Sequence, residues 1–205
     1  MHKLAVATFL VLFGWVNFID AQEVDTVIHT NAYASYYSYS LKDPLYVVYH
    51  LYHGGGDCSR ASFHFMRDSA TADAEDYKKQ GYDKGHLANA EDFAYDCAME
   101  KTTFSYYNCL PQTPRLNRGI WKTWETRIRE ESQREPLEII CGGIFDRKAT
   151  IGSGVSVPTY CWKIVLRVET GAVIHCLLFP NDTSDSFQEI NMEQLKQKLG
   201  FTLKY

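Results

Sequence analysis

The chain has 205 residues and a formal net charge of −4, and 45% of its residues are hydrophobic and 14% aromatic. This composition excludes an intrinsically disordered chain and is typical of a folded globular protein. The acidic balance also argues against a protein that binds nucleic acid through general basicity, because such proteins carry a strong positive excess.

The first 21 residues have the pattern of a secretory signal peptide. His2 and Lys3 precede a mostly apolar run from Leu4 to Ile19, and Ala21 is a small residue suited to cleavage. A membrane anchor is the alternative, but the run is shorter than the ~20 residues that a spanning helix needs. We expect export, cleavage near Ala21, no stable membrane association afterwards, and a secreted or periplasmic protein with one domain over residues 22–205.

Two strands and a long connection are expected next along the chain. Leu45–Tyr52 is rich in aromatic and β-branched residues and predicts a strand, which a loop at Gly54–Asp57 ends. Polar and aromatic residues alternate over Ser62–Phe65, which suggests another strand. The polar residues 68–82 form a connection to a short segment, Asp83–His86.

A helix is predicted from Arg115 to Arg134, because Leu116, Ile120, Trp124 and Ile128 recur every four residues. Further strands are predicted at Leu137–Cys141, Cys161–Val168 and Ala172–Phe179, the last two joined by a turn, and a final helix at Met192–Leu199. Strands and helices that do not alternate strictly indicate an α+β fold with an antiparallel sheet and flanking helices.

The six cysteines contain no CxxC pair, so zinc and dithiol redox motifs are not indicated. Cys58 and Cys97 stand in polar segments, and we predict a disulfide between them. Four cysteines in apolar stretches are expected to be buried thiols: Cys109, Cys141, Cys161 and Cys176.

Four side chains could together hydrolyse a phosphodiester. His86 follows a glycine and can act as a general base near neutral pH, and Lys84 can hold a phosphate oxygen. Asn117 and Glu125 share one side of the predicted helix and offer oxygen ligands that suit Mg²⁺. Each also has a structural explanation, because histidines occur in turns, asparagines cap helices, and Glu125 can pair with Arg129 on a helix surface.

Three motifs resemble those of the DNA/RNA non-specific endonucleases, a ββα-metal family that includes secreted bacterial nucleases and mitochondrial endonuclease G. They are Asp83–Ala90 (DKGHLANA), Tyr107–Gln112 (YNCLPQ), and Leu116–Trp121 (LNRGIW) followed by Glu125. Their order and spacing match the family pattern, and linked motifs are far more specific than any one alone.

The resemblance implies a role for each matched residue. His86 resembles the general base, Asn117 the direct protein ligand of Mg²⁺, Glu125 the residue that orients the water ligands, and Asn108 the asparagine that shapes the site. It also implies a ββα finger, Mg²⁺ as cofactor with Mn²⁺ or another divalent cation able to substitute, and DNA or RNA as substrate with little sequence specificity. No sequence feature specifies an oligomeric state.

The chain departs from the family where Lys84 replaces the motif's arginine. Lysine keeps the charge but lacks the two-pronged guanidinium, so we expect weaker clamping of the phosphate. Arg60, Arg67 and Arg129 are candidates for a further phosphate contact. Two alternatives stay open: a nucleic-acid-binding protein that has lost turnover, and a phosphoesterase that acts on small substrates.

Overall fold

The computed structural model describes residues 22–68, 71–146 and 148–204. The expected signal peptide therefore lies outside the described residues. The strands are β1 (Thr26–His29), β2 (Ala34–Ser38), β3 (Asp43–Leu51), β4 (Asp83–His86), β5 (Cys109–Gln112), β6 (Leu137–Ile144), β7 (Thr150–Ile151), β8 (Val155–Ser156), β9 (Tyr160–Arg167), β10 (Val173–Pro180) and β11 (Gln188–Glu189). The helices are α1 (Ala74–Tyr77), α2 (Cys97–Thr103), α3 (Pro114–Arg118), α4 (Ile120–Glu131) and α5 (Met192–Lys198), with short 3₁₀ turns η1 (Ala90–Phe93) and η2 (Tyr106–Asn108).

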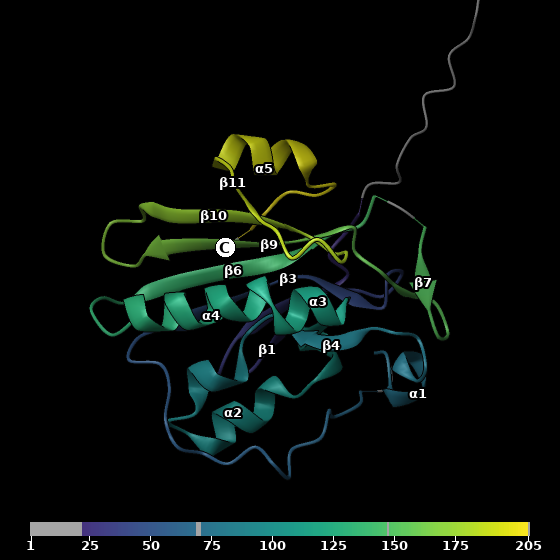
Figure 1. The fold of residues 1–205 in the computed structure, drawn as a ribbon, viewed down its shortest axis with the longest axis horizontal. Helices are drawn as coiled ribbons and strands as arrows, with labels where there is room; N and C mark the ends of the chain where they lie inside the picture. The colour runs from purple at the N-terminus through teal and green to yellow at the C-terminus, as the bar shows by residue number, and fades with distance from the viewer. Residues whose placement is uncertain (1–21, 69–70, 147, 205) are drawn as a thin grey trace, which may run out of the picture.

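The main sheet has seven strands in the order β1-β2-β3-β6-β9-β10-β11, and every pairing in it is antiparallel. Helix α4 crosses in front of this sheet, and α5 lies beside β10 (Figure 1). Helix α2 lies on the side of α4 that is farther from β6. The arrangement confirms the predicted α+β fold. Strands β6 and β9 are almost wholly buried, as expected for the centre of such a core.

Most predicted strands of the sheet are confirmed, with small differences at their ends. Leu45–Tyr52 corresponds to β3, Leu137–Cys141 to β6, and the predicted hairpin to β9 and β10. Gly171 has a φ of +68° in the connecting turn, a conformation that favours glycine. The predicted final helix is α5. Strands β1 (TVIH) and β2 (ASYYS) were not predicted, because both segments are short and show no clear alternation of apolar and polar residues.

The predicted helix from Arg115 to Arg134 is in fact two helices. Gly119 separates α3 from α4 and has a non-helical ψ of −117°. The Asp185 carboxylate accepts a hydrogen bond from the Ile120 backbone N–H at 2.7 Å, and a side chain on Gly119 would collide with that carboxylate. A residue distant in sequence therefore caps α4, so the periodicity continues across a break that it cannot predict.

The predicted strand Ser62–Phe65 is wrong. Among the described residues, this part of the chain makes only an isolated bridge, in which Met66 pairs with Ser105. Phe63 and Phe65 instead pack edge-on against Phe104, at 5.5 Å between ring centroids in each case. Their alternation thus reflects aromatic packing and not a sheet. The connection over residues 68–82 also contains the short helix α1.

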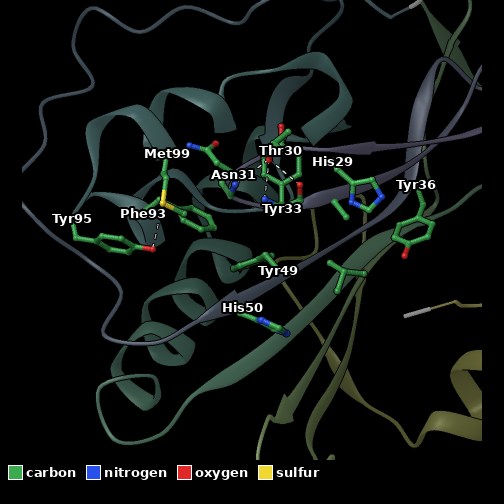
Figure 2. Close-up of a pocket in the computed structure, with 13 residues that line it drawn as sticks. His29, Thr30, Asn31, Tyr33, Tyr36, Tyr49, His50, Phe93, Tyr95 and Met99 are labelled. Carbon is green, nitrogen blue, oxygen red and sulfur yellow. Dashed lines mark hydrogen bonds between the residues drawn. The ribbon is translucent and has the colours of Figure 1, made fainter.

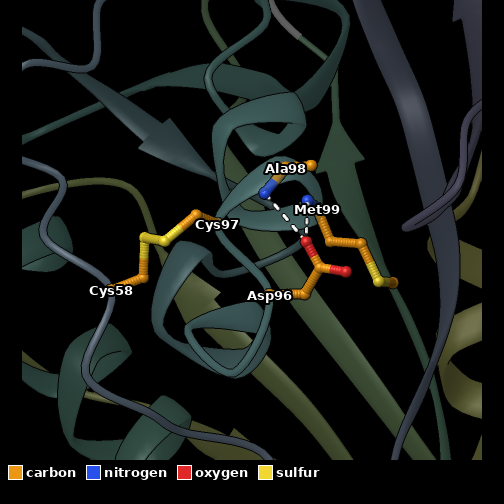
Figure 3. Close-up of a disulfide and its surroundings, with 5 residues drawn as sticks. All are labelled: Cys58, Asp96, Cys97, Ala98 and Met99. Carbon is orange, nitrogen blue, oxygen red and sulfur yellow. Dashed lines mark hydrogen bonds between the residues drawn. A yellow bond between two sulfur atoms is a disulfide. The ribbon is translucent and has the colours of Figure 1, made fainter.

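The predicted disulfide joins Cys58 to Cys97, with a Cα–Cα distance of 5.5 Å (Figure 3). It links the segment after β3 to the first turn of α2. The Asp96 carboxylate caps this helix by accepting hydrogen bonds from the backbone N–H groups of Ala98 and Met99, at 2.8 and 3.2 Å. The other four cysteines are buried free thiols, as expected.

Candidate active site

Strands β4 and β5 and helix α3 form a compact ββα unit that carries Lys84, His86 and Asn117, and the third motif continues into α4 with Trp121 and Glu125. The two strands pair antiparallel, with Asp83 opposite Gln112 and His86 opposite Cys109, and α3 follows β5 directly. The Asp83 carboxylate joins β4 to α3, because it accepts hydrogen bonds from Asn117 Nδ2 at 3.1 Å and from Arg118 at 2.6 and 2.7 Å. This contact fixes the end of α3 relative to β4.

The hydrogen bonds to Asp83 also keep its charge. Burial acts to raise the pKa of Asp83, but the hydrogen bonds from Arg118 and Asn117 outweigh it and lower the pKa below its usual value. Asp83 is therefore ionised near neutral pH. An anionic carboxylate accepts stronger hydrogen bonds than a neutral one, which favours a well-defined position for Asn117.

His86 packs between two aromatic rings at the end of β4. Its ring centroid lies 4.9 Å from that of Phe65 and 4.8 Å from that of Phe104. Its Nε2 atom is buried and has no hydrogen-bond partner among the described residues. Burial, together with the positive charges of Arg60 and Lys84, lowers the pKa of His86 from 6.5 to about 3. The imidazole is thus neutral and able to accept a proton.

Lys84 lies on the same face of β4 as His86, because residues two apart in a strand point the same way. Its ammonium lies over the ring of Phe65 at 5.1 Å and near that of Tyr106 at 6.0 Å. No carboxylate of the described ranges forms an ion pair with it. The structure therefore places one positive charge beside His86 without neutralising it.

The two upstream arginine candidates differ in their surroundings. Arg60 has a half-exposed side chain, and its charge acts on His86, so it lies near the site. It also approaches Glu91 at 4.0 Å. Arg67 is ion-paired with Asp73 at 3.5 Å, and nothing in the described part of the chain connects it to His86. The geometry favours Arg60 of these two.

Asn108 is completely buried and shapes the backbone next to His86. Its Nδ2 donates to the carbonyl oxygens of Ala88 and Thr103 at 2.9 and 2.8 Å, and its Oδ1 accepts from the Ala88 N–H at 2.9 Å. The Leu87 N–H donates to the Asn108 carbonyl at 2.9 Å. The bonds with Leu87 and Ala88 hold the chain directly after β4, so Asn108 orients His86 through the backbone.

Asn117 suits the role of an oxygen ligand for a divalent cation. Because its Nδ2 donates to Asp83, the amide orientation is defined, and within the described ranges its Oδ1 accepts no hydrogen bond. The described residues contain no cluster of three or more His, Cys, Asp or Glu side chains that could hold a metal. A site with one amide oxygen and otherwise water fits Mg²⁺, which retains several of its water ligands.

Glu125 and Arg129 lie on the buried side of α4. Burial raises the pKa of Glu125, whereas Lys163 and Asn89 act in the opposite direction. Arg129 is mostly buried and donates to the Asp92 carboxylate at 2.9 Å and to Asn89 Oδ1 at 3.1 Å. The alternative of a surface pair between Glu125 and Arg129 is therefore wrong, because Glu125 is buried and Arg129 pairs with Asp92. A phosphate contact by Arg129 stays a prediction.

Two residues of the site were not singled out from the sequence. Asp83 heads the first motif but was given no role, although its place before a lysine and a glycine could have suggested a structural anchor. Phe65 contacts His86 across 21 positions of the chain, and no periodicity connects the two. Only the fold shows this contact.

A hollow of about 490 Å³ in the described surface lies apart from these residues. It is lined by side chains of β1, β2 and β3 and of the segment from η1 to α2 (Figure 2). Tyr33, Tyr49 and Phe93 line it, and Tyr95 donates to the sulfur of Met99 at 3.8 Å. None of the predicted site residues lines this hollow.

Comparison with known proteins agrees with the three motifs. A family model described as DNA/RNA non-specific endonuclease matches residues 18–203. The chain is 35% identical over 95 residues to a protein named nuclease from a Nostoc species. This match covers 46% of this chain and 35% of that protein. It is 28% identical over 163 residues to mitochondrial endonuclease G of Bos taurus, covering 70% of this chain and 54% of that protein.

The fold has a close counterpart among solved structures. A chain in a crystal structure of an EndoG/EndoGI complex superimposes with a TM-score of 0.77, covering 86% of this chain and 84% of that one, at 22% identity. This likeness supports the fold alone. The chain spans about a third of the Nostoc protein and about half of the bovine one.

Proposed function

Since the chain belongs to the DNA/RNA non-specific endonuclease family, we propose that it is a secreted, Mg²⁺-dependent endonuclease that hydrolyses phosphodiester bonds. One observation carries the proposal. The imidazole of His86 is neutral, and its Nε2 has no hydrogen-bond partner among the described residues. It stands beside Lys84, which forms no ion pair in that part of the chain, and Asp83 ties the same strand to Asn117. A base, a cation and an oxygen ligand are thus presented by one rigid ββα unit.

In the proposed reaction, His86 accepts a proton from a water molecule as the water oxygen attacks phosphorus. The new bond forms between the water oxygen and phosphorus, and the bond from phosphorus to the 3′ oxygen breaks. Lys84 holds a non-bridging phosphate oxygen, and the approach of the negatively charged substrate raises the pKa of His86, which strengthens it as a base. Asn108 keeps the backbone after His86 in place.

Asn117 would hold the divalent cation through its Oδ1, with Glu125 orienting water molecules around it. When bound, Mg²⁺, or Mn²⁺ or another divalent cation in its place, neutralises charge on the phosphate and on the departing oxygen. The residues named so far would contact the phosphodiester backbone and not base edges. We therefore expect DNA and RNA to be cut with little sequence specificity.

We further propose that residues 1–21 are removed on export and that residues 22–205 form a single domain outside the cytoplasm. The Cys58–Cys97 disulfide supports this, because such bonds persist in oxidising compartments. Within the described ranges, no helix has both the length and the apolarity needed to cross a bilayer.

The second candidate is a nucleic-acid-binding protein of the same fold that cuts weakly or not at all. The net charge of −4 and the lysine at position 84 favour it.

Digestion of plasmid, single-stranded DNA and RNA with Mg²⁺, analysed on agarose gels with and without EDTA, separates the two candidates. We expect EDTA-sensitive cutting of all three substrates. Binding without cutting across several divalent cations would favour the second candidate, and a preference for bis-p-nitrophenyl phosphate would indicate a small-substrate phosphoesterase.

A further inference from the structure

The segment from Cys58 to Met66, here called the strap, runs across the ββα unit and is fixed at both ends. At one end, Cys58 is bonded to Cys97, and its N–H donates to the Ala94 carbonyl at 3.2 Å. At the other, the Met66 N–H donates to the Phe104 carbonyl at 2.8 Å. A segment held in this way can present a side chain in a defined position without being part of the sheet.

The side chain that the strap presents to β4 is Phe65. Its ring contacts His86, with centroids 4.9 Å apart, and the Lys84 ammonium lies 5.1 Å from its centre. The rings of Phe104 and Tyr106 pack against the same ring, with centroid distances of 5.5 and 5.4 Å. Phe65 is thus the one strap residue, among those described, for which ring contacts to both β4 side chains are found.

These contacts matter because the groups found around the Lys84 ammonium, within the described ranges, are the rings of Phe65 and, farther away, Tyr106. A lysine ammonium is a point charge on a flexible four-carbon stem, whereas an arginine has a planar group that is more easily fixed. In the described part of the chain, no carboxylate or carbonyl binds Lys84. The face of an aromatic ring attracts a cation and limits its movement. Because this attraction is weak, the ammonium can still bind a phosphate.

We propose that Phe65 is a positioning residue. Its ring holds the Lys84 ammonium and the His86 imidazole in positions from which both can act on the same phosphate. Lys84 can then take the role of the motif's arginine, because the Phe65 ring of the strap restricts the movement of its flexible side chain. The inference rests on the proposed nuclease function.

The test compares three substitutions on the strap in Mg²⁺-dependent plasmid cleavage. Phe65→Leu keeps the apolar volume but removes the ring, and we expect kcat to fall about 10- to 100-fold, because small displacements of reacting groups have effects of that size. Phe65→Tyr should rescue cutting to within about threefold of the wild type. Phe63→Leu is the matched control, since Phe63 packs on Phe104 and has no ring contact with Lys84 or His86 in the described structure.

A double-mutant cycle with Lys84→Ala separates positioning from general stability. If the ring acts through Lys84, the loss caused by Phe65→Leu should shrink to about threefold once the ammonium is gone. An equal loss in both backgrounds, or equal effects of Phe65→Leu and Phe63→Leu, would overturn the inference. Thermal unfolding of each variant shows whether a fall in activity reflects loss of the fold.

Titration of His86 by NMR gives a readout that does not depend on cutting. Burial is the main cause of its low pKa, and Arg60 and Lys84 are the charged groups that act on it, both of them positive. Removing the ring of Phe65 admits water, so the pKa of His86 should rise in Phe65→Leu and stay unchanged in Phe63→Leu. An unchanged pKa in Phe65→Leu would overturn the inference. A wild-type protein that cuts nothing, but shows the shift, would contradict the proposed function and leave the contact established.

Discussion

His86 is unprotonated in the folded protein, as a general base must be before it accepts a proton. Burial between Phe65 and Phe104 removes water from the imidazole, and two neighbouring positive charges disfavour a third. The same burial would make a charged histidine costly, so the side chain is ill suited to a structural ion pair. Its surroundings favour chemistry over packing.

The low pKa of His86 predicts an unusual pH dependence. A pKa lowered from 6.5 to about 3 means that the base form persists as the pH falls, so kcat/KM should not decline near pH 6.5. At saturating Mg²⁺ we expect more than about half of the pH 7.5 value at pH 5.5, where an unperturbed histidine would retain about a tenth. A midpoint near pH 6.5 would show that His86 is solvated in the working enzyme.

Replacement of Lys84 by arginine tests whether the departure from the family motif limits the rate. The guanidinium can bind two phosphate oxygens and can also stack on Phe65, so we expect cutting to increase about three- to tenfold. Steady-state cleavage of a defined duplex provides the measurement. Unchanged or lower activity in Lys84→Arg would mean that lysine with its aromatic support is already sufficient.

Asn117→Ala should act on the cation more than on the nucleic acid. Loss of the proposed amide ligand is expected to raise the Mg²⁺ concentration for half-maximal activity by at least about tenfold, because even indirect contacts at metal sites have effects of 10- to 100-fold. The affinity for uncut DNA, measured in EDTA by fluorescence anisotropy, should change little. An unchanged Mg²⁺ titration would remove Asn117 from its proposed role.

At the scale of elements, the ββα unit depends on contacts between segments far apart in the sequence. Asp83 ties β4 to α3, and Asn181, which follows β10, donates to the carbonyl oxygens of Pro111 and Pro158 and accepts from the Thr113 N–H. The unit is thereby attached to the main sheet at the start of α3. Such polar contacts give a site the rigidity that positioning of a base and a cation requires.

The disulfide should contribute to stability as well as to the position of the strap. It closes a loop with a sequence separation of 39, for which the chain-entropy model gives about 4 kcal/mol. Denaturant titrations should therefore show the Cys58→Ser/Cys97→Ser variant to be less stable than the wild type by an amount approaching that value. A reducing agent should destabilise the wild type but not the variant. A wild type that is insensitive to reduction would contradict this assignment.

Element types could be predicted where a segment is long and its pattern regular, as in β3, β6, the β9–β10 hairpin and α5. The strand at Ser62–Phe65, within the strap, was wrongly predicted because Phe63 and Phe65 alternate as in a strand but pack on Phe104. The break at Gly119 could not be predicted, since Asp185, 65 residues away from Ile120, creates it. Local patterns fail where a distant residue provides the partner.

For the whole molecule, the α+β class followed from the order of elements, and the motifs gave the family. The inward direction of Glu125 and Arg129 did not, because helical spacing alone cannot distinguish a buried polar face from a solvated one when both carry charges. The ion pair of Arg129 with Asp92 makes that burial possible. The role of Phe65 also needed the fold, since it depends on two segments meeting.

The acidic balance is compatible with the proposed function because the positive groups are local. Lys84 and Arg60 both act on His86, and no acidic side chain of the described residues is among the groups that shift its pKa. An enzyme that must release its products needs charge at the reacting phosphate more than a broad basic surface.

The central claim is that this protein cuts nucleic acid with His86 as the base. The most direct test is plasmid cleavage by the wild type, His86→Ala and the control His64→Ala, whose side chain is exposed on the strap, each in Mg²⁺ and in EDTA. We predict cutting by the wild type and His64→Ala in Mg²⁺ only, and a loss of about 10²- to 10⁴-fold in His86→Ala with the fold intact. Full activity in a folded His86→Ala protein would contradict the account.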